Sequence, residues 1–312
     1  MSTGLELAKQ YYETYGRPMI AEQFPQYEER IAVGLVGPGS ECFGFDDEIS
    51  RDHDFEAGFC LWVTSEDEEA VGFRLSRAYK KLPSEFMGIK KQAQSFFGGN
   101  RRGVLEIGEF YSRFTGSPGE PENWQQWLTI PESSLAEAVN GQVFRDDLGE
   151  FTRIREELKK GYPEDVRLKK LAARAALSAQ AGQYNYNRCV NRGEYGAAGL
   201  AAGEFVKNAA SMIYLLNRRY PPYYKWILRG IKNLPRLSYL EEPLNKLASS
   251  PLAQEGEISR FALIETICQG LIEELKHQKL SAGNWDYLEP HALEITQHIQ
   301  NSQIRNLHIM EG

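Results

Sequence analysis

Two apolar runs that flank a glycine-rich polar segment constrain the fold of this chain more than any other feature. The first run is Ile31 to Leu35, the second is Phe55 to Val63, and Val36-Gly37-Pro38-Gly39-Ser40 follows the first. Apolar runs of this length, bounded by glycine and proline, are typical of buried β-strands. The pattern therefore predicts a strand, a tight glycine turn, and a second strand that opens with Asp52-His53-Asp54.

Asp52 and Asp54 are separated by one residue, so on a strand their side chains would share one face and His53 would take the other. Neighbouring carboxylates repel each other, and a hard divalent cation such as Mg2+ is the usual compensation. The Gly39-Ser40 turn offers what a phosphate needs, because glycine permits close backbone approach and serine adds a hydroxyl donor. The segment thus predicts a site for a metal ion and a phosphate.

The order of these residues resembles the nucleotidyltransferase superfamily of DNA polymerase β. Its signature is a Gly-Ser turn after the first strand and an Asp-x-Asp on the next, and Gly39, Ser40, Asp52 and Asp54 match it one by one. The longer pattern from Gly39 to Asp54 resembles a bacterial branch known mainly as a domain of unknown function with a C-terminal helical domain. The resemblance implies Mg2+ or Mn2+ on the two aspartates, ATP or another NTP as substrate, and Gly39-Ser40 against the β- and γ-phosphates.

In that superfamily a third carboxylate comes from a later strand beside the aspartate pair. Gly103 to Phe110 is a short apolar run interrupted by Glu106, which makes Glu106 the candidate for a metal ligand or general base. Glu109 is the second choice. The alternative for Glu106 is a solvent-facing side chain on an edge strand. Asp146-Asp147 is interpreted as a turn-forming pair rather than part of the site.

Composition limits the classes of partner. The 312-residue chain carries a net charge of −7, which argues against a large nucleic-acid interface. Its 4 cysteines are far apart and form no Cys-x-x-Cys, and neither a signal segment nor a membrane-length apolar run is found. We therefore expect a reduced, cytoplasmic protein that binds a nucleotide and a small-molecule acceptor, with no membrane and no nucleic-acid partner. The oligomeric state is not specified by the sequence.

From Phe151 onward the sequence predicts helices throughout. One helix is expected from Phe151 to Lys160, and Asp165 is expected to cap the next. The predicted fold class is therefore α+β. A small mixed β-sheet nucleotidyltransferase domain, residues 1–150, would be followed by an all-α helical bundle domain, residues 151–312, that closes the active site.

The helical half also offers cations for a triphosphate, whose charge the metal ions do not fully cancel. Tyr184 to Glu194, expected to lie between two helices, contains Arg188 and Arg192. Tyr220 to Trp226 contains Lys225 and weakly resembles the helical domain of aminoglycoside-type nucleotidyltransferases. We predict Lys225 as a nucleotide contact, followed by Arg188 and Arg192. The alternative is that Lys225 anchors the start of a helix and that the two arginines are surface or ion-pair residues.

The leading hypothesis is a metal-dependent nucleotidyltransferase that moves a nucleoside monophosphate, with AMP from ATP as the favoured case, onto a hydroxyl, amine or phosphate of a small acceptor. Two alternatives stay open. The chain could be a catalytically inactive nucleotide-sensing or protein-interaction module of the same fold. It could instead act on a protein or tRNA, although its net acidity disfavours tRNA.

Overall fold

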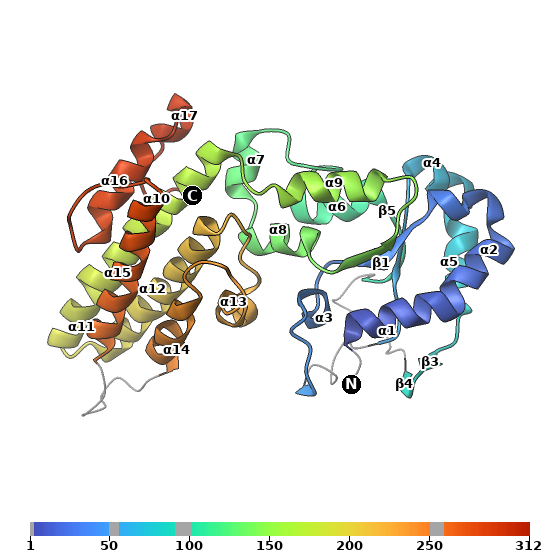
Figure 1. Cartoon of the computed structure of the whole chain (residues 1–312), viewed down its shortest axis with the longest axis horizontal. Helices are drawn as coiled ribbons and strands as arrows, with labels where there is room; N and C mark the ends of the chain where they lie inside the picture. The colour runs from blue at the N-terminus through green and yellow to red at the C-terminus, as the bar shows by residue number, and fades with distance from the viewer. Residues whose placement is uncertain (1–2, 50–55, 91–100, 250–258) are drawn as a thin grey trace. The chain divides into compact units, whose positions relative to one another are not determined.

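The computed structural model describes residues 3–49, 56–90, 101–249 and 259–312. The chain forms two compact units (Figure 1). The first comprises the residues up to Gln126 together with Ser134–Lys160, and the second comprises Trp127–Ser133 together with Gly161–Gly312. Asp52, His53 and Asp54 lie outside the described residues. The division into functional domains at residue 150 stays a prediction.

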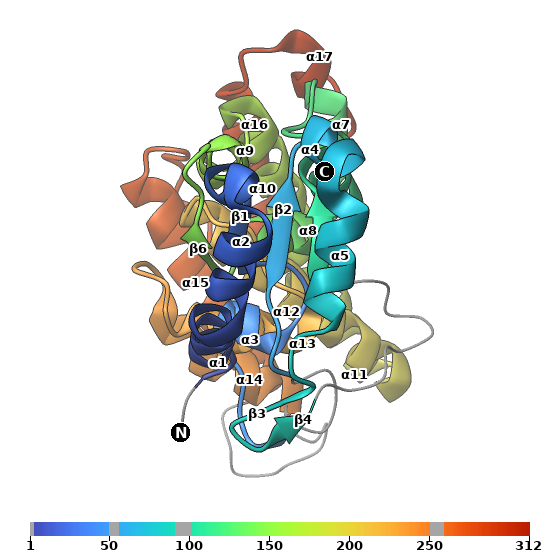
Figure 2. The same cartoon turned by 90° about the vertical axis from the view of Figure 1, so that its right-hand side faces the viewer.

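The first unit is built on a mixed sheet of β1 (Ala32–Leu35), β2 (Cys60–Val63), β5 (Gly103–Glu106) and β6 (Gln142–Arg145). The strand order is β5-β2-β1-β6. β1 pairs antiparallel with both β2 and β6, whereas β2 pairs parallel with β5, so β1 and β2 lie side by side in the middle (Figure 2). A separate hairpin joins β3 (Glu85–Phe86) to β4 (Ile89–Lys90). The predicted α+β class with a small mixed sheet is confirmed.

Side-chain alternation along β2 gives the sheet two apolar faces. Leu61 and Val63 join Val33 in a core covered by the N-terminal helices and by the helix after β2. Trp62 points the other way, where its ring stacks on Phe151 at a centroid distance of 3.9 Å and meets Phe110 at 5.4 Å. The covering helices are α1 (Gly4–Tyr11), α2 (Arg17–Gln23), α4 (Ser65–Asp67), α5 (Phe73–Lys80), α6 (Ile107–Thr115) and α9 (Glu150–Lys159).

Strand and helix limits differ from the predictions at three places. The sequence predicts a helix from Thr3 to Tyr15 that Arg17-Pro18 ends, but the helical run continues to Gln23, because a π-helical turn at Tyr12–Gly16 joins α1 to α2. β2 begins only at Cys60, and residues 56–59 before it are not strand. β5 ends at Glu106, where α6 begins. The expectation that Asp52-His53-Asp54 opens the second strand is therefore not supported by the start of β2.

Thr3 begins the first helix with a reciprocal pair of hydrogen bonds. Its hydroxyl accepts from the Glu6 amide at 3.2 Å, and the Glu6 carboxylate accepts from the Thr3 amide at 2.8 Å. We expect Thr3→Ala to lower the melting temperature by about 2–4 °C, since losing such a cap costs about 1 kcal/mol. Thr3→Asp, which keeps an accepting oxygen, should melt close to wild type in the same scan; equal losses in both variants would contradict the capping role.

The second unit is helical, as predicted. Its longest helices are α12 and α15, and α10 packs against both α12 and α16. In the described residues no helix is both long and apolar enough to cross a membrane. The elements are α10 (Glu164–Ser178), a π-helical stretch (Ala179–Tyr186), α11 (Asn187–Asn191), α12 (Tyr195–Leu216), α13 (Tyr224–Ile231), α14 (Glu241–Ser249), α15 (Arg260–His277), α16 (Leu288–Gln297) and α17 (Ser302–Arg305).

Three buried cations on α10 bind backbone carbonyls near the ends of other helices. The Arg167 guanidinium donates to the Leu215 carbonyl at 3.3 Å. Lys169 donates to the carbonyls of Leu307 and His308, at 3.1 and 2.6 Å, and Lys170 donates to the Leu128 carbonyl at 2.8 Å. The last carbonyls of a helix have no partner within it, so a cationic side chain is a favourable donor there. The carbonyls of Leu215 and His308 also accept from the backbone amides of Arg218 and Glu311. α10 thereby fixes several helix ends in one unit.

Two expectations for this half are wrong. Tyr184 to Glu194 was expected between helices, but most of it continues the helical run through α11. Asp165 does not cap α10, which begins at Glu164 after Pro163. Its carboxylate instead accepts from the amides of Gln300 and Asn301, at 3.0 and 2.8 Å. The reason is a tertiary contact with a segment far along the chain, which helix-capping patterns do not reveal.

Candidate functional site

The loop after β1 is held in a strained glycine conformation. Gly39 has φ of +135°, and a Cβ there would lie 2.5 Å from Oε1 of Glu41, so only glycine fits. Asn140 fixes the preceding part of the loop with two bonds to Gly37: its Oδ1 accepts from the amide at 2.9 Å, and its Nδ2 donates to the carbonyl at 2.8 Å. Ser40 then begins α3 (Ser40–Phe43). The predicted turn after the first strand is present.

A buried ion triad lies directly beside this turn. Arg102 donates from Nη2 to Oε1 of Glu41 at 2.9 Å and pairs through Nη1 with Oε1 of Glu56 at 3.1 Å. The side chains of Arg102 and Glu41 are each only 9% exposed. Burial raises the pKa of Glu41, and the Arg102 guanidinium acts in the opposite direction. The triad thus fixes the carboxylate that packs against Gly39.

The sheet register brings these residues to one place. Gly34 of β1 and Gly103 of β5 both pair with Cys60, the first residue of β2. The turn after β1, Glu56 before β2 and Arg102 before β5 therefore gather where β2 begins, which we call the Cys60 end of the sheet. Asp52 and Asp54 precede Glu56 along the chain. Residues 56–59 lead into β2 at this end of the sheet.

Glu106 lies at the opposite end of the sheet. It pairs with Val63, the last residue of β2. Its carboxylate accepts from the amides of Gly108 and Glu109, which makes Glu106 the N-cap of α6. Both the register and these bonds argue against Glu106 as the third carboxylate beside the Gly39-Ser40 turn. Glu109, the second choice, lies exposed in the first turn of α6, also beyond this far end.

Sequence reasoning missed Glu41, Glu56, Arg102 and Asn140. A signal existed for Glu56, because Asp52, Asp54 and Glu56 alternate along the chain. In the residues the structure describes, no group of three or more His, Cys, Asp or Glu side chains is arranged to hold a metal ion. The nearby thiols are not nucleophiles, since burial raises the pKa of Cys60 to about 12 and that of Cys42 well above its usual value.

The cations predicted to contact a nucleotide all lie exposed on the helical unit. The Arg188 guanidinium covers the Tyr184 ring at 4.7 Å, and the Lys225 ammonium covers the Trp226 ring at 5.1 Å. Arg192 is the C-cap residue directly after α11. Their role as nucleotide contacts stays a prediction. Asp146 accepts from the amides of Gly149 and Thr152, which agrees with a turn-forming role.

Comparison with known proteins gives limited similarity. A family model described as a domain of unknown function (DUF4037) matches residues 127–227. The solved structure of a nucleotidyltransferase-like protein from Exiguobacterium sibiricum 255-15 is similar over 94% of this chain and 81% of that one, with 15% identity and a TM-score of 0.37. No curated protein matches the chain.

Proposed function

We propose that the chain is a metal-dependent nucleotidyltransferase. One observation carries this proposal: the Gly39-Ser40 turn lies at the Cys60 end of the sheet, where β2 begins, and Asp52-x-Asp54 precedes β2. The superfamily resemblance rests on a Gly-Ser turn after the first strand followed along the chain by Asp-x-Asp, and this sequence has the two in that order. The Arg102 triad supports the proposal by holding that turn in a fixed shape.

The proposed chemistry gives each of these features a single role. Asp52 and Asp54 offer hard oxygen ligands, which suit Mg2+ or Mn2+. The Gly39-Ser40 turn would contact the β- and γ-phosphates of ATP or another NTP. An acceptor hydroxyl, amine or phosphate would attack the α-phosphorus and bond to it, while the bond to the departing oxygen breaks and pyrophosphate leaves. Glu106 has no role in this scheme, because it caps α6 at the other end of the sheet.

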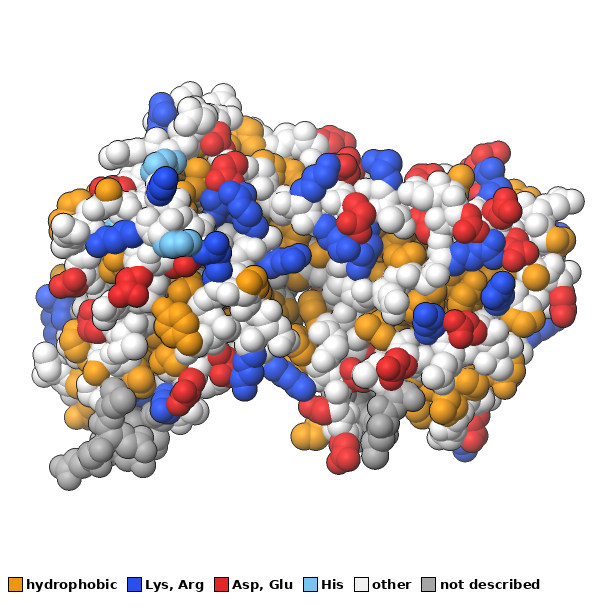
Figure 3. All heavy atoms as spheres, viewed as in Figure 1, with side chains coloured by type: hydrophobic (Ala, Val, Ile, Leu, Met, Phe, Trp, Pro, Cys, Tyr) orange, Lys and Arg blue, Asp and Glu red, His pale blue; other side chains and the backbone are white. Residues whose placement is uncertain are grey.

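A small acceptor fits the charge distribution better than nucleic acid. On the face visible in Figure 3, Lys and Arg side chains are interspersed with Asp and Glu on either unit, and no broad basic area appears. Nucleic-acid binding draws most of its affinity from clustered cations along a phosphate backbone. We therefore propose a small-molecule acceptor, with a protein or tRNA acceptor as the alternative that an acceptor screen would detect.

The test is calorimetric titration with a non-hydrolysable ATP analogue in the presence and absence of Mg2+. Asp52→Asn combined with Asp54→Asn should weaken Mg2+-dependent binding at least about tenfold, because the metal loses its charged ligands. Glu106→Gln is the matched control and should bind as wild type does. Equal affinity in wild type and the double variant would reject the metal assignment. Binding without pyrophosphate release across small, protein and tRNA acceptors would instead favour an inactive nucleotide sensor.

A further inference from the structure

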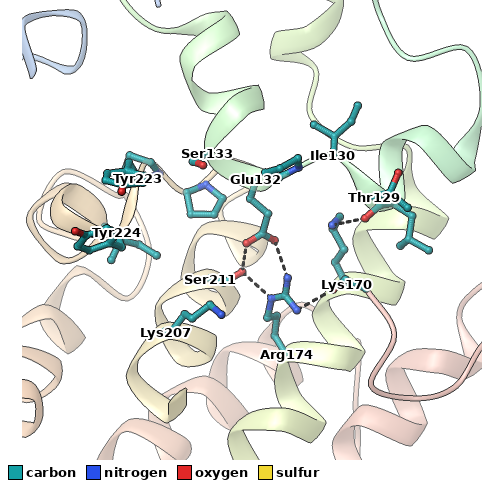
Figure 4. Close-up of a pocket in the computed structure, with 16 residues that line it drawn as sticks. Thr129, Ile130, Glu132, Ser133, Lys170, Arg174, Lys207, Ser211, Tyr223 and Tyr224 are labelled. Atoms are coloured by element: carbon teal, nitrogen blue, oxygen red, sulfur yellow. Dashed lines mark hydrogen bonds and ion pairs between the residues drawn. The ribbon is translucent and has the colours of Figure 1, made fainter. Parts of the chain in front are cut away.

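The helical unit contains a cavity of about 400 Å³ whose lining residues all belong to that unit (Figure 4). This volume is within the range of small-molecule sites. Its walls come from the end of α7 (Trp124–Thr129), the start of α8 (Glu132–Val139), α10, α12 and the segment from Pro221 to Ile227. The segment that matches the domain of unknown function contains every lining residue except Gly312.

The cavity carries an excess of positive charge. Among the described side chains that line it, Lys170, Arg174 and Lys207 are cationic and Glu132 is the acid. Glu132 is already engaged, since its Oε2 accepts from the Ser211 hydroxyl at 2.8 Å and its Oε1 lies 3.7 Å from Arg174 Nη2. Figure 4 shows these three side chains pointing toward one another. One carboxylate therefore offsets one of the three cations.

Arg174 has a structural role, whereas Lys207 offers an exposed ammonium to a ligand. Arg174 donates to the Ser211 hydroxyl at 3.3 Å and to the Gly312 carbonyl at 2.8 Å. Lys170 gives one bond to the Leu128 carbonyl at 2.8 Å, and an ammonium has three N–H groups. Lys207 has a 73% exposed side chain and a 3.9 Å ion pair with Glu204. Lys207 is therefore the cation that an entering anion would meet, whereas Lys170 is only 2% exposed and adds positive charge behind the wall.

The rest of the wall is largely apolar and partly aromatic. Pro221, Pro222 and Ile227 line it together with Tyr223 and Tyr224, whose rings lie 4.4 Å apart between centroids. The two tyrosines are 46% and 73% exposed. Exposed aromatic rings beside a cation provide a surface on which a flat ring can pack while its charged group reaches Lys207.

We propose that this cavity binds a small organic anion that carries a flat ring, a ring-bearing carboxylate or phosphate monoester. The anionic group lies against Lys207 at the exposed side of the cavity, and the ring packs against the tyrosine and proline wall. The proposal does not rest on nucleotidyl transfer, because every residue in it belongs to the helical unit.

The test is calorimetric titration of the full chain with phenyl phosphate, benzoate, benzyl alcohol and inorganic phosphate. At least one ring-bearing anion should bind with a Kd of about 1 mM or tighter, and the neutral ring and the ringless phosphate should each bind at least about tenfold more weakly. The stronger of the two ring-bearing anions identifies the preferred anionic group.

Lys207→Glu should weaken that binding at least about tenfold, since it reverses a charge at the cavity. Lys246→Glu is the matched control, because Lys246 is another exposed lysine with an acidic partner one helical turn away and does not line the cavity. Both sites are at the surface, so both variants should fold, which thermal unfolding will verify. Three results overturn the proposal: neither ring-bearing anion binds at about 10 mM, benzyl alcohol binds as tightly as they do, or both variants bind equally.

Discussion

Arg102→Met should lower the free energy of unfolding by about 3–5 kcal/mol at pH 7, because it leaves the buried Glu41 and the half-buried Glu56 without their cation. Arg102 bonds to both Glu41 and Glu56, and its own side chain is 9% exposed. Methionine replaces the volume of the stem but none of the charge. Urea unfolding of wild type and variant measures the loss, and Arg74→Met, at an exposed arginine of α5, is the control that should change stability little.

The pH dependence of that loss identifies its cause. Burial raises the pKa of Glu41 even with Arg102 beside it, and removing Arg102 should raise it further. A carboxyl whose pKa is higher in the folded chain than in the unfolded chain takes up a proton on folding. The free energy of unfolding therefore falls as pH rises from the lower of these two pKa values to the higher. The deficit of Arg102→Met should therefore be larger at pH 8 than at pH 5, and Glu41→Gln in the same chain should recover some of it. A deficit independent of pH would indicate lost packing instead.

Local conformation explains what the sequence could predict at this site. The turn at Gly39 was predictable because positive φ is a local demand that glycine meets. The triad was not, since Glu41 and Arg102 are 61 residues apart and their pairing depends on the register of β5 against β2. Glu106 was misplaced because Val104, Leu105 and Ile107 form one apolar run across a strand end and a helix start. Its carboxylate marks that boundary as a cap.

In the helical unit, too, contacts between distant parts of the chain could not be predicted from the sequence. On α10, Leu168, Leu171 and Ala172 recur at helical spacing and are buried, which is what such a stripe predicts. The same spacing could not predict that Lys169 and Lys170 are buried, because the carbonyls that bind them come from distant segments of the chain. A helix pattern identifies which residues are apolar but not which polar residues meet a carbonyl from elsewhere.

Lys170→Met should make the stability gap between wild type and variant depend on pH. Burial lowers the pKa of Lys170 from 10.5 to about 8, although Glu132 acts in the opposite direction. Between these pH values the unfolded chain keeps the proton that the folded chain has released, so raising pH stabilises the wild type. The unfolding free energy of wild type minus that of Lys170→Met should rise by about 3 kcal/mol across this interval.

The change of this free-energy difference with pH distinguishes the effect of the buried charge from that of the lost hydrogen bond. Losing the bond to the Leu128 carbonyl changes the difference in unfolding free energy between wild type and variant by a similar amount at every pH. The ionisation of Lys170 makes that difference vary with pH, and only where the charge of the side chain changes. Lys207→Met, at a side chain that is 73% exposed, is the control and should give a flat difference. Urea unfolding at several pH values from about 7.5 to 10 makes the comparison. A flat difference for Lys170→Met as well would mean that Lys170 keeps its proton through this range, and that the cavity holds a full ammonium at alkaline pH.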